Sequence, residues 1–165
     1  MLTIKEIRRC AKPKLTINPA NLALAQEALN HLWSERLEER GYEKLPGRGG
    51  SCKFAALLAR ELFGGRLDGN LDHVFVRKDK AIFDLNEQEE DVLILGASAH
   101  LSTPWVLHHL DYRESLGSCI PRVLRWAQWV LQHPDAQLVA LERQEQSPAS
   151  INDSKGLQVN EMGGP

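Results

Sequence analysis

The sequence feature that most constrains this fold is a glycine-rich turn that ends where an apolar, helix-like segment begins. The turn, residues 41–50, contains one proline and four glycines, which interrupt any regular secondary structure. Apolar residues then recur at helical spacing from Ser51 or Cys52 to about Phe63, and two glycines follow at 64–65. The sequence therefore predicts a central helix with Cys52 in its first turn.

Two further segments have a helical pattern, one on each side of this region. The pair Asn18-Pro19 is typical of a helix start, and apolar residues continue at helical spacing up to Gly41. Near the other end, Ser118 can cap a final helix over 119–132, and the segment 102–116 is predicted to be helical in part. We expect these C-terminal helices to cover the core.

Short apolar runs between the helices predict a small sheet. Segments 72–77 and 80–85 are rich in β-branched and aromatic residues, and they are predicted to form a hairpin. The run 92–95 is predicted to be a third strand, and 67–70 a loop. Residues 138–141 fit either a last strand or an extension of the final helix.

The composition fits one globular domain of the α+β class. Of the 165 residues, 42% are hydrophobic and 25% are charged, which supports a hydrophobic core but not a second full domain. We assign the domain to residues 1–143. The segment 144–165 is dominated by polar residues, proline and glycine, and this composition predicts a disordered tail.

Charge and cysteine content limit the partners and the cellular compartment expected for the protein. A net charge of −2 provides no global basic field for nucleic acid or anionic membrane, and no apolar stretch approaches the roughly 18 residues of a membrane span. Cys10, Cys52 and Cys119 are too widely spaced to predict a disulfide framework or a zinc ribbon. We expect a cytoplasmic protein that needs no cofactor or metal, although export by a specialised secretion system stays open.

Cys52 has the surroundings of a reactive thiol. A helix N-terminus stabilises a thiolate through its unpaired N–H groups and the helix dipole, and so lowers a pKa that is normally about 8.5. The backbone N–H of Cys52 is also placed to bind the oxyanion of an attacked carbonyl. Small residues, Ala55, Ala56 and Ala59, share the same helix face and allow a sheet to pack closely beside the thiol.

The predicted hairpin brings a histidine and an aspartate together. If the turn is Lys78-Asp79, or a four-residue loop in the same register, Val76 faces Ala81 and His73 faces Asp84 across the strands. Such neighbours have Cβ atoms about 4.5 to 5.5 Å apart, so the carboxylate can hold one imidazole nitrogen and leave the other for a thiol. The pairing depends on the register, since a slip of one residue would separate the two side chains.

These residues resemble those of the papain-like and transglutaminase-like cysteine hydrolase superfamily. The resemblance covers about residues 49–86, and it implies a cysteine-bearing helix packed on a small antiparallel sheet. It also implies Cys52 as nucleophile, His73 as general base and Asp84 as the group that orients the base, with Asn86 as a second candidate for that last role. A thiol hydrolase or acyltransferase of this kind acts on an amide or thioester in a protein or peptide substrate.

The sequence departs from the pattern of this superfamily at the oxyanion site. Papain-like peptidases often have a glutamine upstream of the cysteine, and none occurs between Gly41 and Ser51. Ser51 or Asn70 could take its place. The interval from Cys52 to His73 is also short, which puts ordinary peptidase activity in doubt more than it does the fold.

Two alternatives compete with this hypothesis. An isolated cysteine, histidine or aspartate is more often structural than catalytic, so the chain could be a non-catalytic protein that binds a partner through Arg122, Trp126 and Trp129 on the final helix. These tryptophans could equally seal the rim of the core. A zinc site is less well supported, because its possible ligands lack the spacing of known metal motifs. Those ligands are His100, His108, His109 and Cys119, together with the three predicted catalytic residues.

Overall fold

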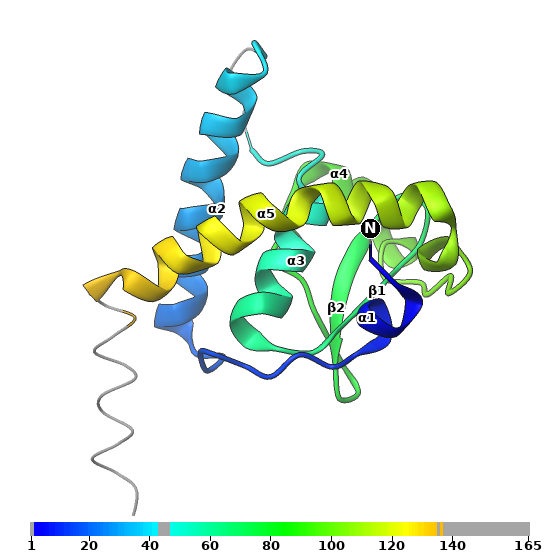
Figure 1. The fold of residues 1–165 in the computed structure, drawn as a ribbon. Helices are drawn as coiled ribbons and strands as arrows, with labels where there is room; N and C mark the ends of the chain where they lie inside the picture. The colour runs from blue at the N-terminus through cyan, green and yellow to red at the C-terminus, as the bar shows by residue number, and fades with distance from the viewer. Residues whose placement is uncertain (1, 43–46, 135, 137–165) are drawn as a thin grey trace, which may run out of the picture.

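The computed structural model describes residues 2–42, 47–134 and 136, and it shows an α+β fold (Figure 1). Helices surround a three-stranded antiparallel sheet, as the sequence predicts for the fold class. The predictions for residues 138–141 and for the tail at 144–165 lie outside the described residues. Within the described residues, no helix is both long and apolar enough to cross a membrane.

The first two helices each begin at a residue whose side chain caps the helix, and the second of these starts was predicted. In α1 (Ile4–Arg8), Thr3 and Glu6 form a reciprocal capping box. In α2 (Pro19–Glu39), the Asn18 side chain accepts a hydrogen bond of 2.8 Å from the backbone N–H of Asn21, and proline occupies the first helical position. The predicted start of this helix is therefore confirmed.

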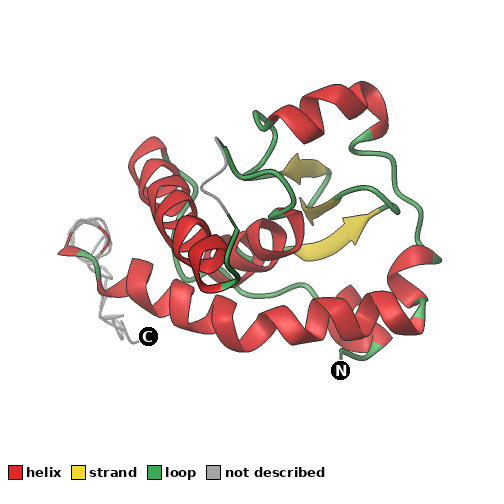
Figure 2. Cartoon of the chain, turned by 90° about the horizontal axis from the view of Figure 1, so that it is seen from above, coloured by secondary structure: helices red, strands yellow, loops and turns green. Residues whose placement is uncertain are grey.

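The central helix, α3 (Cys52–Phe63), has the predicted boundaries. Gly50 enters it with a φ of 76°, and Gly64 ends it with a φ of 79°. A Cβ atom at Gly64 would lie 2.7 Å from the carbonyl oxygen of Ala11, so only glycine fits this helix end. The helix packs on β1 and β2 with one side and on α5 with the other (Figure 2).

The sheet has the order β1-β2-β3, and its first strand was not predicted. The segment predicted as a loop belongs to β1 (Arg66–Gly69), which pairs with β2 (Val74–Lys78). The strand was missed because Leu67 is the only one of its four residues with a sizeable apolar side chain. Gly69 is required here, since a Cβ atom would lie 2.5 Å from the carbonyl oxygen of His73.

The hairpin of β2 and β3 (Ala81–Phe83) forms, but its predicted register is wrong by two residues. Val76 pairs with Phe83, and Lys78 pairs with Ala81. The turn is therefore Asp79-Lys80, where Asp79 adopts a φ of 55°. An even shift keeps every side chain on its original face of the sheet, so the two predicted site residues stay on one face.

The predicted third strand is also wrong, because Val92 to Leu95 belong to a short helix, α4 (Glu90–Leu95). Acidic residues in its first turn favour a helix start, and a short apolar run does not distinguish helix from strand. Two single turns, η1 (Gly96–Ser98) and η2 (Val106–His108), then lead to the last helix.

The last helix, α5 (Leu110–Gln132), is one continuous element. The predicted boundary at Ser118 is wrong, because the helix continues through Ser118 and Pro121. Packing of α5 against α3 and α2 supplies apolar contacts along its length, which offset the backbone hydrogen bond that proline cannot make (Figure 1). The core lies between these helices and β2, and its fully buried members include Leu29, Leu58, Leu116, Val74 and Val130.

Candidate active site

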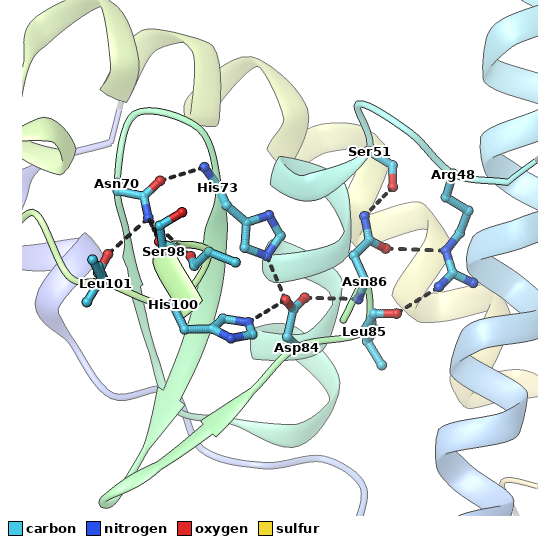
Figure 3. A network of polar contacts seen from close by, with 11 residues as sticks. Arg48, Ser51, Asn70, His73, Asp84, Leu85, Asn86, Ser98, His100 and Leu101 are labelled. Atoms are coloured by element: carbon cyan, nitrogen blue, oxygen red, sulfur yellow. Dashed lines mark hydrogen bonds and ion pairs between the residues drawn. The ribbon is translucent and has the colours of Figure 1, made fainter. Parts of the chain in front are cut away.

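His73 and Asp84 meet at one end of the sheet. His73 lies directly before β2, and Asp84 lies directly after β3. The Nε2 atom of His73 is 2.6 Å from the Oδ2 atom of Asp84, and the side chains are 2% and 1% exposed (Figure 3). The structure thus brings the predicted pair together as diagonal rather than directly facing residues of the hairpin.

Cys52 completes the arrangement from the first turn of α3. Its side chain is half-buried, and it lies close enough to His73 to raise the pKa of the imidazole. Because Asp84 binds Nε2 of the imidazole, Nδ1 is the ring nitrogen left for the thiol. Burial lowers the pKa of His73, but hydrogen bonds with Asp84 and Cys52 and the charges of both raise it to about 9.

The carboxylate of Asp84 accepts three hydrogen bonds in all. Oδ2 accepts from His73 and also faces Nε2 of His100 at 2.9 Å, while Oδ1 accepts from the backbone N–H of Asn86 at 2.9 Å. Burial raises the pKa of Asp84, yet these hydrogen bonds and the charge on His73 outweigh burial and hold the pKa below its usual value. The aspartate is therefore ionised and can orient the imidazole.

Asn70 fixes the backbone around both histidines. Its Oδ1 atom accepts hydrogen bonds of 2.9 Å from the backbone N–H groups of Asp72 and His73. Its Nδ2 atom donates to three backbone carbonyls in the loop that carries His100, those of Ser98, Ala99 and Leu101 (Figure 3). The amide is engaged by the protein itself, so Asn70 positions the site and does not serve as the oxyanion donor that the sequence suggested.

A second buried network joins the glycine-rich turn to the segment after β3. Asn86 donates from Nδ2 to Oγ of Ser51 at 2.8 Å and accepts at Oδ1 from Nε of Arg48 at 3.3 Å. Arg48 also donates to the carbonyl of Leu85 at 2.8 Å and forms an ion pair of 2.9 Å with Glu89. This network holds the residues before Cys52 against the residues after Asp84.

The same network engages Ser51 and Asn86, two residues predicted as oxyanion or orienting candidates. Ser51 accepts from Asn86 and makes no side-chain cap on α3, so the first backbone N–H groups of that helix have no side-chain acceptor. An oxyanion near Cys52 could bind there. Asn86 supports the aspartate through its backbone, whereas Asp84 contacts the imidazole.

Sequence reasoning missed Arg48, and it considered His100 only as a metal ligand. A single arginine in a glycine-rich turn gives no signal of burial, yet Arg48 is only 6% exposed. His100 comes from a loop whose position depends on long-range contacts. In the described part of the chain, His73, Asp84 and His100 place ligand atoms within 4.8 Å of one another, so they could hold a divalent metal ion. Cys119, His108 and His109 do not join this group.

Tyr112 and Lys53 lie close to the thiol. The Nζ atom of Lys53 lies 4.9 Å from the ring centroid of Tyr112 and donates to Oγ of Ser115 at 2.6 Å. Burial and the charge of Cys52 raise the pKa of Tyr112, so its hydroxyl stays protonated. That hydroxyl faces the carbonyl oxygen of Asn70 at 3.4 Å. Neither residue has a periodic or motif signal in the sequence.

The three residues proposed for partner binding do not form one exposed surface. Trp126 is 4% exposed and packs against Phe54 with ring centroids 5.2 Å apart. Arg122 makes two hydrogen bonds of 3.0 and 2.6 Å to Glu39 of α2. Trp129 is 39% exposed. Trp126 therefore belongs to the core, which is the sealing role that the sequence left open.

Searches against protein-family models, curated proteins and solved structures find no significant match to this chain.

Proposed function

We propose that this protein is a thiol hydrolase or acyltransferase that uses Cys52, His73 and Asp84 on an amide or thioester. The observation that carries the proposal is the grouping of three residues: the imidazole of His73 binds the buried carboxylate of Asp84 at 2.6 Å, and Cys52 lies close enough to raise the pKa of that imidazole. A buried ion pair is expensive to desolvate and weakly stabilising, so a buried, proton-carrying group beside a thiol is better explained by chemistry than by stability.

In the first half of the reaction, an S–C bond forms at the substrate carbonyl and the bond from that carbon to the leaving amine or thiol breaks. His73 takes the thiol proton on Nδ1, and the thiolate of Cys52 attacks the carbonyl carbon, so that an S–C bond forms and the π electrons move to oxygen. The free N–H groups at the start of α3 stabilise this oxyanion. The oxyanion then collapses, the leaving amine or thiol takes the proton from His73, and an acyl-enzyme remains.

The second half releases the acyl group. Water or an acceptor amine loses a proton to His73 and attacks the thioester carbon, after which the S–C bond breaks and Cys52 regains the proton. Asp84 keeps the imidazole oriented and stabilises its charged form in both halves. The same residues serve hydrolysis and acyl transfer, and a protein or peptide is the substrate we infer.

The architecture supports a papain-like classification for this proposal. The nucleophile begins a helix that packs on an antiparallel sheet, while the base and the orienting acid come from the ends of neighbouring strands. Spatial placement of this kind matches the superfamily that the sequence resembles. The order of the three residues along the chain matches it as well.

Alkylation kinetics test the proposal directly. Iodoacetamide labelling of each cysteine, followed by peptide mass spectrometry, should show Cys52 reacting at least about ten-fold faster than exposed Cys10 near pH 6, where an imidazolium favours the thiolate. Cys119 serves as the slow reference, because burial raises its pKa. Equal rates at Cys52 and Cys10 across the acidic and neutral range would contradict a catalytic thiol.

A covalent intermediate provides the second readout. Incubation with a small acyl thioester should add one acyl mass to the chain, and hydroxylamine should remove it. The adduct should be absent from the Cys52→Ser variant and present in Cys10→Ser, which is the matched control.

A further inference from the structure

We infer that the substrate carries a carboxylate or phosphate group, which binds in a basic cavity beside Cys52. This inference rests on the thiol chemistry proposed above and names the substrate class for it. The cavity has a volume of about 420 Å³ and lies among side chains of α2, α3 and α5. Gly50 and Lys53, which lie two residues before and one residue after Cys52, line its wall, so the cavity adjoins the first turn of α3 and a ligand that extends beyond it could reach the thiol.

The charge of the cavity is strongly positive. Its cationic lining residues are Arg36, Arg40, Lys53, Arg122 and Arg125. In the described part of the chain, no acidic side chain lines the cavity. Glu39 is the nearby carboxylate that pairs with them, at 2.6 Å from Arg122 and 3.8 Å from Arg36. At the edge, Asp91 accepts a hydrogen bond from the backbone N–H of Gly50.

Three of the described cations form no close ion pair with a carboxylate, although Glu39 is near enough to Arg125 for their charges to interact. Among the described residues, Arg40, Lys53 and Arg125 form no ion pair with a carboxylate. Lys53 binds a hydroxyl and an aromatic ring, and Arg40 lies over the ring of Tyr42 at 5.2 Å. Neither partner cancels the charge, so the cavity keeps a positive potential that an anion would complement.

The apolar wall of the cavity also contains an unsatisfied donor. Trp33 and Phe54 line it, with ring centroids 5.4 Å apart. Trp33 is 7% exposed, and its Nε1–H group has no acceptor in the described part of the chain. Buried donors are rarely left without an acceptor, and an oxygen of a bound anion that reached this wall would supply one.

Two alkylating reagents of nearly equal shape test the inference. Iodoacetate is an anion and iodoacetamide is neutral, so the ratio of their rates at Cys52 measures the preference for a negative charge. The exposed pair Arg40 and Arg125 can be changed without disturbing the core. We expect the ratio to fall about three-fold in R40Q/R125Q and about ten-fold in R40E/R125E. The control K5Q/R8Q removes the same charge from α1 and should keep the wild-type ratio.

The outcomes separate this inference from the proposed function. An unchanged ratio in both cavity variants, with normal iodoacetamide labelling of Cys52, would overturn the inference and leave the thiol chemistry in place. A wild-type Cys52 that reacts with iodoacetamide no faster than Cys10 would contradict the proposed function instead.

Titration calorimetry measures anion binding in a variant that lacks the Cys52 thiol. Titration of the Cys52→Ser variant with inorganic pyrophosphate and with glutarate distinguishes phosphate from carboxylate as the bound group. Binding of one of them that weakens about ten-fold when R40E/R125E is added supports the inference. Absence of binding for both anions, or equal binding in the presence of R40E/R125E, overturns it.

Discussion

The sheet contains two buried aspartates that differ in the partner that each one binds. Asp68 in β1 accepts hydrogen bonds from Nε of Arg77 at 2.8 Å and from Oγ of Ser102 at 2.6 Å. Asp84 after β3 accepts from two imidazoles. Burial raises the pKa of both carboxyls, and hydrogen bonds outweigh it and lower the pKa in each case.

The difference shows why burial alone does not decide the chemistry of a carboxylate. The guanidinium of Arg77 keeps its proton at any working pH, so Asp68 can only hold β1 to β2. His73 can lose and regain a proton, and it lies close enough to Cys52 for the two groups to interact. Substitutions at the two aspartates and at their partners should therefore affect the reactivity of Cys52 differently.

Removal of the imidazole should have the largest effect. The His73→Ala variant should lower the iodoacetamide rate of Cys52 near pH 6 by about one hundred-fold, because the thiol then has no proton acceptor. Arg77→Gln, the corresponding change at Asp68, should keep the wild-type rate. A similar loss of rate in both variants would mean that the fold, rather than proton transfer, controls the reactivity.

Substitution of the two aspartates should separate reactivity from stability. Asp84→Asn should lower the labelling rate of Cys52 about ten-fold, because the amide orients the imidazole less well and does not stabilise its charge. Asp68→Asn should leave labelling unchanged and lower the free energy of unfolding by about 1 to 2 kcal/mol, measured by urea denaturation. Loss of labelling in the Asp68→Asn variant would contradict a purely structural role for Asp68.

The pH dependence of stability should differ between the two sites. The folded pKa of His73, about 9, lies above its unfolded value near 6.5, so its stabilisation is complete below about pH 6.5 and is lost as pH rises through 9. The pKa of Asp84 is lowered, so its stabilising contribution has the opposite pH dependence: it is present at neutral pH and is lost only as pH falls below about 4.

Urea denaturation near pH 6.5 and near pH 9.5 measures the stabilisation that depends on the charge of His73. The free energy of unfolding of the wild type should fall by roughly 2 kcal/mol more than that of His73→Gln between these conditions. The Arg77–Asp68 pair does not titrate in this range, so Asp68→Asn should show the wild-type decrease. Equal decreases for wild type and His73→Gln would show that the imidazole is not stabilised in its charged form.

Changes at His100 should have the smallest effect on labelling. The His100→Gln variant should change the iodoacetamide rate of Cys52 by less than about three-fold, because Asp84 keeps its bond to His73. If the two histidines and the aspartate bind Zn²⁺, added zinc should slow wild-type labelling, and His100→Gln should weaken this effect about ten-fold. An unchanged zinc effect would place the ion elsewhere.

Local signals in the sequence predicted the cysteine-bearing helix well. The boundaries of α3 follow from glycines at both ends and from helical spacing between them, and these are interactions within a few residues. The contact between His73 and Asp84 was predicted from a wrong register. It survived because the error was even, which preserves the faces of both strands.

The remaining features depend on contacts between distant segments. β1 has an arginine and an aspartate in a four-residue strand, and pairing with β2 rather than composition makes it a strand. The run at Val92 to Leu95 is too short for its period to identify a helix. The positions of Arg48 and His100 depend on loops closed by side-chain hydrogen bonds, which leave no periodic trace.

Asn70 has a consequence for how this site could respond to its surroundings. One amide joins the turn before His73 to the loop that carries His100, so a displacement of that loop by a bound molecule would also shift the imidazole that contacts Cys52. Mechanical coupling of this kind would make the reactivity of the sulfur sensitive to events at the outer surface of the loop.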